Sequence, residues 1–366
     1  SMLSKALIPK PDLGAQMRGV TVTTRDPAGP RKLVYGKVRT GGNVVFIDHS
    51  GDDNKYLHLV VVFASHEIQG YDEIWFNDNK IWTSSGGFQS DWGTYVTIDR
   101  KFGTAGQAAS TTAEDTNNSL VSASSHWTTD HKLSGIAYIA FRLEWNRDKF
   151  PQGVPNITAV IRGKKVFDPR TEVFTYSQNP ALCVRDYLLD SKYGLGEESS
   201  NINYTALAAA ANLCEEQVSL SGGGTQDRYQ CNGVIDTSNQ IRANIEQLLS
   251  CMGGRLTYSG GEYFIEGAEY RTPTVTIDES VIISPIKTQT KQSRRSIYNS
   301  VKGTFLSEEK NYKVLDYPAQ TLKTLAGSFE TNKKYRILFV GTTDFTAIGA
   351  SSNAVGVEFT ATGAGS

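Results

Sequence analysis

A run of closely spaced β-strand segments between residues 31 and 82 constrains the fold more than any other part of this chain. Its segments are rich in Val, Ile, Phe, Tyr and Trp, and polar turn residues separate them. Because residues 57–63 are apolar at nearly every position, both faces of that strand are expected to be buried. The pattern predicts a β-barrel or sandwich without a catalytic motif. The predicted strands are 33–39, 43–49, 56–65, 73–76 and 80–83.

The length, composition and net charge place the chain among ordinary folded proteins and argue against some functions. Of the 366 residues, 39% are hydrophobic and 20% are charged. At roughly 100–200 residues per domain, this length predicts two to three domains. A formal net charge of -1 argues against non-specific binding to nucleic acid or to an anionic membrane. No apolar run approaches the ~20 residues that a membrane-spanning helix needs.

The first half of the chain is predicted to be an arm followed by a β-domain. The N-terminal arm covers residues 1–30, and within it 19–24 (GVTVTT) alternates apolar and polar residues. The arm packs either on a neighbouring subunit or on its own barrel. The β-domain covers 31–170 and is interrupted at 84–132 by an excursion rich in Ser, Thr, Gly, Ala and Asn. The remaining strands of this half are predicted at 94–98, 133–145, 156–162 and 164–167.

From residue 171 the hydrophobic periodicity changes from two to 3.6, which predicts an α/β domain over 171–285. Asn179 followed by Pro180 is typical of a helix start. Helices are predicted at about 180–193, 204–217 and 238–252, with a strand at 229–234 and a hairpin at 255–266.

Two further segments complete the predicted organisation. Residues 286–325 form a β segment, and 326–366 form a small all-β module of short alternating strands. The predicted fold class is therefore β-rich α+β. It combines a β-barrel or sandwich domain with an inserted loop region, an α/β domain with about three helices, and the small C-terminal module.

The excursion at 84–132 carries the first candidate interaction surface. We assign it to Trp92, His126, Trp127 and His131, because exposed aromatic side chains often mark contact sites. In the alternative interpretation, which is the more common one, each ring anchors the loop onto the barrel.

The second candidate surface is a basic patch formed by Lys287, Lys291, Arg294 and Arg295. Four basic residues within nine positions suggest phosphate binding. However, Glu308 and Glu309 follow and the total charge is balanced, so a solvated face or a subunit contact fits better.

Motifs for chemistry are missing from the sequence. It contains no GxSxG, HExxH, GxxxxGK[ST] or GxGxxG motif. The spacing of His126 and His131 is only weakly compatible with a metal site, and 48–54 lacks the terminal Glu of a calcium loop. The four cysteines match no zinc pattern and are expected to be buried free thiols, with a disulfide as the alternative. We therefore predict no cofactor, no metal and no enzyme.

Two stretches resemble a known family. The segment 179–196 reads NPALCVRDYLLDSKYGLG, and an Ala-rich helix ending in AAAANLCEEQ follows it. This order resembles the central hub region of phage tail tip attachment proteins, the lambda J-protein family. The stretch 30–42 (PRKLVYGKVRTGG) resembles the opening of the hub β-domain in the same proteins. The C-terminal module resembles one that recurs in phage tail and fibre proteins.

The resemblance implies a virion structural protein. In that family, a homotrimer forms a ring at the distal end of the tail tube, with the distal tail protein and the tape-measure protein as partners. Residues 286–325 would return to the hub. The chain would be assembled in the bacterial cytoplasm and carried in the virion tail. Lambda-type proteins are far longer than this chain, so direct contact with a host receptor is less strongly implied.

Two other functions stay open at this point. A receptor-binding or glycan-binding tail module would use the aromatic residues of the 84–132 excursion. An enzyme that degrades the cell envelope would need carboxylate pairs that the sequence alone does not reveal.

Overall fold

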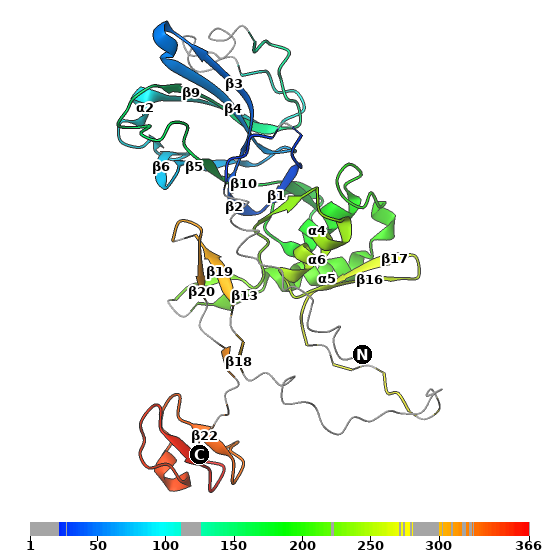
Figure 1. The fold of residues 1–366 in the computed structure, drawn as a ribbon. Coiled ribbons are helices and arrows are strands. Elements are labelled where there is room, and N and C mark those ends of the chain that lie inside the picture. Colours follow the sequence, from blue (N-terminus) through cyan, green and yellow to red (C-terminus); the bar gives the residue numbers. More distant parts are fainter. Residues whose placement is uncertain are drawn as a thin grey trace, which may run out of the picture. The chain divides into compact units, whose positions relative to one another are not determined.

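In the computed structural model, the chain forms two compact units, Ser1–Thr274 and Val275–Ser366. The first unit has two main hydrophobic cores, one inside a β-sandwich (residues 37–162) and one inside a helical lobe (residues 165–266). Figure 1 shows the sandwich mainly in blue and cyan and the lobe in green. The residues described are 22–26, 28–110, 126–220, 223–270, 272–273, 275–278, 280, 300–301, 303–308, 310–316, 320–321, 324 and 326–365.

Two antiparallel sheets form the sandwich. The four-stranded sheet has the order β3-β4-β9-β8, and the five-stranded sheet has the order β2-β10-β5-β6-β7. Their facing sides bury a core that includes Leu59, Phe63, Ile74 and Phe141. The four-stranded sheet consists of β3 (Asn43–Ser50), β4 (Tyr56–Ala64), β9 (Ala137–Glu144) and β8 (Val96–Phe102). The five-stranded sheet consists of β2 (Lys37–Gly41), β10 (Ile157–Arg162), β5 (Gly70–Phe76), β6 (Asn79–Thr83) and β7 (Gly87–Phe88).

The strand β4 is buried on both faces, as its continuous apolar run predicts. Leu59 and Val61 point into the core between the sheets, while Val60 belongs to a smaller cluster on the outer face. The 3-10 turn η1 (Asp52–Asn54) connects β3 and β4. Asp53 and Asn54 both have positive φ there, which is tolerated best by Gly, Asn and Asp.

The single strand predicted at 33–39 is wrong. Two strands occupy this stretch, β1 (Lys32–Tyr35) and β2, and they pair with different partners. The break falls at Gly36, whose φ is +63°. A Cβ at this position would lie 1.9 Å from the carbonyl oxygen of Cys231, so only glycine allows the chain to turn here.

Part of the predicted excursion belongs to the sandwich. The strands β7 and β8 lie within 84–132 and pair with β6 and β9. The strand predicted at 94–98 is half correct, because Trp92–Tyr95 forms the short helix α2 and β8 begins at Val96. Of the excursion, residues 111–125 lie outside the described part of the chain.

The described part of the lobe contains three α-helices, as predicted, and several two-stranded sheets. Its core gathers side chains from all three helices, among them Leu188 of α4, Leu207 of α5 and Leu248 of α6. Figure 1 shows the three helices together with the β16–β17 hairpin. The helices are α4 (Pro180–Leu189), α5 (Tyr204–Glu215) and α6 (Ile241–Ser250). The 3-10 turn η2 (Ser199–Asn201) precedes α5. The strands are β11 (Lys165–Asp168), β12 (Val173–Tyr176), β13 (Gln217–Ser219), β14 (Thr225–Asp227), β15 (Gly233–Asp236), β16 (Arg255–Ser259) and β17 (Glu262–Glu266).

Three predicted boundaries in the lobe are wrong by three or four residues. The helix expected at about 180–193 is α4, which ends at Leu189. The strand expected at 229–234 is β15, which begins only at Gly233. The residues before it form hydrogen bonds that are not part of a β-sheet, such as the bond from Tyr229 N to Cys214 O. The third helix begins at Ile241 rather than at residue 238. Residues 236–239 form a turn instead, closed by the bond from Ser238 N to Asp236 Oδ1.

The Asn179-Pro180 pair starts α4 as expected. The Asn179 side-chain oxygen accepts a hydrogen bond from Ala181 N at 3.1 Å, and Pro180 occupies the first turn. The Asn179 amide nitrogen also donates to the Ala211 carbonyl and to Glu215 Oε1, both at 2.9 Å. A single buried side chain therefore caps α4 and ties it to α5.

The second unit contains short strands and a small C-terminal core. Within its described residues, β18 (Ser300–Val301) pairs with β21 (Gln320–Thr321), and β19 (Thr304–Ser307) pairs with β20 (Lys313–Asp316). The C-terminal module pairs β22 (Lys334–Arg336) with β23 (Glu358–Thr360), with the 3-10 turn η4 (Phe345–Ile348) beside them. Phe329 and Phe345 each pack edge-on against Phe359 in its core.

Candidate functional site

The two tryptophans of the predicted interaction surface are structural anchors. Trp127 is only 4% exposed and stacks on His131, with ring centroids 4.9 Å apart. It packs against Phe46 at 5.1 Å and covers the outer face of the four-stranded sheet. Trp92 packs against Phe76 at 5.7 Å. Trp127 is therefore buried and Trp92 partly buried, which agrees with the alternative in which each ring anchors the loop onto the barrel.

The two histidines of the same set remain accessible. The side chain of His126 is 76% exposed, and its Nδ1 lies 2.9 Å from Asp48 Oδ2 on β3. His131 is exposed at its edge and accepts a hydrogen bond from Thr128 N at 2.9 Å. The structure thus places His126 and His131 at the rim of the Trp127 cluster. Whether this rim forms an interaction surface stays a prediction.

The basic patch of Lys287, Lys291, Arg294 and Arg295 lies outside the described residues. Its assignment as a subunit contact stays a prediction.

Sequence reasoning missed the junction between the sandwich and the lobe, which β1 forms. On one edge, β1 pairs antiparallel with β15 of the lobe. On its other edge, Val34 N donates to His66 Nε2 at 2.8 Å, and Lys164 N donates to the Val34 carbonyl at 2.8 Å. The side chains alternate accordingly. Val34 lies in the sandwich core, and Leu33 and Tyr35 lie in the lobe core.

A buried charge network reinforces this junction. Lys164 Nζ lies 2.7 Å from Asp186 Oδ2 and 2.9 Å from Asp190 Oδ2, and all three side chains are less than a fifth exposed. Burial acts to lower the pKa of Lys164, but the two carboxylates outweigh it and raise that pKa. The Lys164 ammonium also lowers the pKa of Asp190 against the opposing effect of burial. Lys164 and Asp190 are therefore charged at neutral pH, and the contacts of Lys164 with Asp186 and Asp190 link the end of the sandwich to α4.

His66 is held as a neutral ring at the same junction. Its Nε2 accepts the hydrogen bond from Val34 N, so its Nδ1, 2.7 Å from the Glu67 carbonyl, carries the proton. Desolvation, with a smaller contribution from nearby Lys164, lowers the His66 pKa to about 4 against the opposing effects of the Glu67 carbonyl and Asp190.

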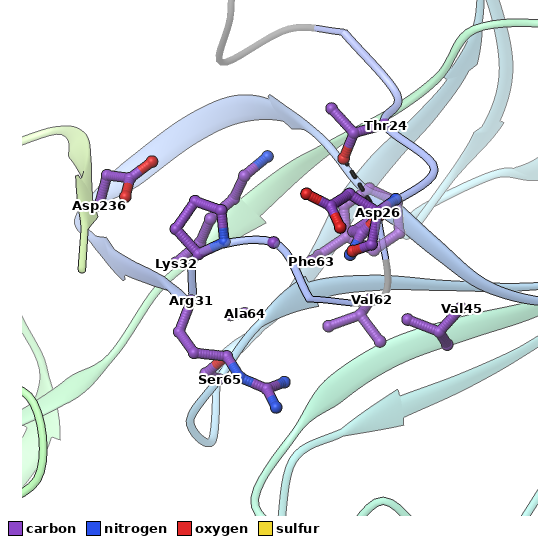
Figure 2. A pocket seen from close by; sticks show the side chains of 13 residues that line it. Thr24, Asp26, Arg31, Lys32, Val45, Val62, Phe63, Ala64, Ser65 and Asp236 are labelled. Carbon is purple, nitrogen blue, oxygen red and sulfur yellow. Dashed lines mark hydrogen bonds between the residues drawn. The ribbon is translucent and has the colours of Figure 1, made fainter. Parts of the chain in front are cut away.

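One side of the junction is hollow. A pocket of about 180 Å³ is lined by residues from the N-terminal segment, from β3 and β4, and by Asp236 of β15. Figure 2 shows Asp26 and Asp236 on opposite sides of this opening, with Lys32 and Arg31 between them. Lys32 Nζ donates to the Gly41 carbonyl at 2.8 Å, and burial lowers the Lys32 pKa.

The cysteines are free in this structure, as the sequence favoured. Cys183, Cys214 and Cys231 are buried in the lobe core, and Cys251 is partly exposed. Burial raises the pKa of Cys214 to about 11, which keeps its thiol protonated and unreactive at neutral pH. Across the described residues, no three His, Cys, Asp or Glu side chains are arranged to hold a metal ion. The helices described there are also too short or too polar to cross a membrane.

Comparison with known proteins confirms the resemblance that the motifs indicated. No family model matches the chain. The tip attachment protein J of Escherichia phage SECphi27 is 24% identical over 238 residues, which cover 60% of this chain and 19% of that protein. The baseplate hub protein pb3 of Escherichia phage T5 is 21% identical over 240 residues, covering 60% of this chain and 25% of pb3. The chain thus spans about a quarter or less of these curated relatives.

A solved structure supports the fold independently. A chain from the virion of a native gene transfer agent particle matches with a TM-score of 0.50 and 15% sequence identity. The match covers 82% of this chain and 66% of that chain. The β-rich α+β fold is therefore similar to that of a chain from this particle, and the sequence is similar to those of a phage tip attachment protein and a phage baseplate hub protein.

Proposed function

We propose that this chain is a structural subunit of the hub at the tip or baseplate of a phage-type tail. In this proposal three copies form a homotrimeric ring that closes the distal end of the tail tube and connects it to host-recognition parts. The homology to a tip attachment protein and a baseplate hub protein, over 60% of this chain, carries the proposal. The chain would assemble in the bacterial cytoplasm and reside in the virion tail. Its expected partners are the distal tail protein and the tape-measure protein.

The accessible surface supports an assembly role. In the described part of the lobe, the edge strand β12 pairs only with β11, and it exposes Val173 by 49% and Phe174 by 60%. An exposed apolar edge strand is a site for pairing with another chain, and soluble monomers normally protect such edges. Trp145 and Tyr258 are each 62% exposed elsewhere on the first unit. These side chains are candidates for subunit contacts.

A structural role also fits the chemistry of the site. The charge network of Lys164 with Asp186 and Asp190 lies at the junction and joins two parts of the fold. The relatives carry the names of structural tail components. We therefore propose no enzymatic activity and no cofactor.

The receptor-binding or glycan-binding alternative receives less support. Sugar recognition by Trp92 and Trp127 needs open ring faces, and both rings are packed against aromatic neighbours. A host receptor or glycan remains a candidate partner through the exposed His126 and His131 rim.

Light scattering over a concentration series tests the proposal. We expect a mass near three times the chain mass of 40.1 kDa. Phe174→Asp should lower the trimer fraction by placing a charge on the β12 edge. Tyr270→Asp, at a side chain that is 87% exposed, is the matched control and should leave the mass unchanged. A strict monomer at every concentration would contradict the homotrimer.

A further inference from the structure

A groove at one corner of the sandwich receives an extended stretch of the N-terminal segment. Thr24 forms a parallel bridge with Asn43: Thr24 N donates to the Gly42 carbonyl at 3.0 Å, and Val44 N donates to the Thr24 carbonyl at 2.8 Å. On the opposite side, the Thr23 hydroxyl donates to the Ile157 carbonyl at 2.8 Å and accepts from Ile157 N at 2.6 Å. The segment thus joins β3 of one sheet to β10 of the other.

The groove is shaped for the main chain of a strand. A Cβ at Gly41 would lie 2.3 Å from the Val22 carbonyl oxygen and 2.8 Å from Val22 N. Glycine here makes room for the passing backbone. The side chains of Asn43 and Asn156 complete the groove, because Asn156 Oδ1 accepts from Thr23 N at 2.7 Å and Asn43 Oδ1 accepts from the Thr24 hydroxyl at 3.1 Å. These uncharged contacts fit an uncharged strand such as Val22-Thr23-Thr24.

The connection from this segment to β1 is attached mainly at its two ends. Its first end is Asp26, which exchanges hydrogen bonds with the Asn43 side chain. Its second end is Arg31, whose amide donates to Thr237 Oγ1 at 2.9 Å. Between them, Ala28 N and Gly29 N bond only back to Asp26 in the described hydrogen bonds. The pocket of Figure 2 lies beneath this connection. The connecting residues can therefore take another path without loss of core packing.

We propose that segment 22–26 exchanges between copies of this chain, so that the Thr23 and Thr24 of one copy occupy the groove of its neighbour. The inference rests on the proposed homotrimer. The hydrogen bonds are the same whether the strand comes from the same copy or from the next one, and exchange of an identical element is a low-cost way to join subunits. Inside a ring, the neighbouring groove is held at high effective concentration, which favours the exchanged form. Each exchanged arm would tie one subunit to the next.

Cysteine cross-linking distinguishes the two arrangements. The side chains of Thr24 and Asn43 touch at 3.1 Å, so a Thr24→Cys, Asn43→Cys chain should form a disulfide when oxidised at a concentration where light scattering shows a trimer. Covalent dimers and trimers on a non-reducing gel support exchange. Disulfide-linked monomers alone would overturn it while leaving the trimer intact. The two single variants control for bonds to Cys251, the one native thiol that is partly exposed.

A mixing experiment supplies a readout that does not depend on cysteine oxidation. A chain that begins at residue 28 keeps an empty groove, while a Gly41→Val chain keeps its arm but has a blocked groove. Neither can complete the contact within itself. The control mixture contains two Gly41→Val chains that differ only in isotope content. If arms exchange, native mass spectrometry should find more mixed assemblies in the test mixture than in this control. Mixed assemblies no more abundant than in that control would overturn arm exchange, and a wild-type chain that stays monomeric would overturn the trimer as well.

Discussion

The hydroxyl of Tyr35 donates a hydrogen bond to Asp186 Oδ2 at 2.6 Å, and this bond joins β1 to helix α4. Tyr35 is 1% exposed, and burial raises the pKa of its hydroxyl, so the proton stays on the donor. The same Asp186 oxygen binds Lys164 at 2.7 Å. The strand that joins the two cores is therefore fixed through its side chain as well as its backbone.

Tyr35→Phe should destabilise the first unit by about 1–2 kcal/mol, since it leaves a buried carboxylate with one fewer donor. The free energy of unfolding in urea measures this. Tyr204→Phe is the matched control, because the Tyr204 side chain is 53% exposed, and its effect should stay within about 0.5 kcal/mol. Equal effects of the two variants would show that the bond to Asp186 contributes nothing.

Lys164→Met should cost about 3–5 kcal/mol, because it removes the ammonium that binds the largely buried carboxylates of Asp186 and Asp190. Adding Asp186→Asn and Asp190→Asn to the same chain should recover part of the loss, since the buried negative charges are then gone. Chemical denaturation of the three chains tests this. If the triple variant were less stable than Lys164→Met, charge burial would not be the cause.

The stability of the first unit should fall as the pH is lowered from about 6.5 to about 4. The His66 pKa is lowered in the folded state to about 4, so in this window the unfolded chain binds a proton that the folded chain does not. The full contribution, at most about 3 kcal/mol, is present above pH 6.5. Urea midpoints measured across this range should decline less for His66→Gln. His49→Gln, whose side chain is 61% exposed, should follow the wild-type curve.

Trp127→Ala should destabilise the sandwich by about 3 kcal/mol or more, because it opens a cavity over Val60 and Tyr138. Trp145→Ala provides the comparison at a ring that is 62% exposed, and it should change the melting temperature little. Equal stability of the two variants would contradict the burial of Trp127 and would make a role of this ring in binding a candidate again.

Local patterns in the sequence predict most of the sandwich and the lobe, because alternation and helical periodicity depend on near neighbours. The long apolar run around Leu59 and the cap at Asn179 are examples. The break at Gly36 escapes this reasoning, since the alternation of apolar residues continues through it and the cause is a carbonyl of Cys231, almost 200 residues away along the chain. The burial of Trp127 also escapes this reasoning, because its Ser- and Thr-rich neighbours in the sequence give no sign of the sheet face that the ring covers.

The junction could not be predicted for a similar reason. Tyr35, Lys164 and Asp186 come from three separate segments, and each alone looks like an ordinary polar residue. Only the folded chain brings them within bonding distance. The same holds for the groove, because the need for glycine at position 41 becomes visible only when the folded chain places the Val22 backbone against it.

The alternation of side chains along β1 has a thermodynamic consequence. Val34 cannot leave the sandwich core unless the strand moves, and that movement withdraws Leu33 and Tyr35 from the lobe core. Neither core can melt while the other stays intact, so the sandwich and the lobe should unfold as one cooperative block. In a calorimeter the first unit would then show a single endotherm, with equal calorimetric and van't Hoff enthalpies.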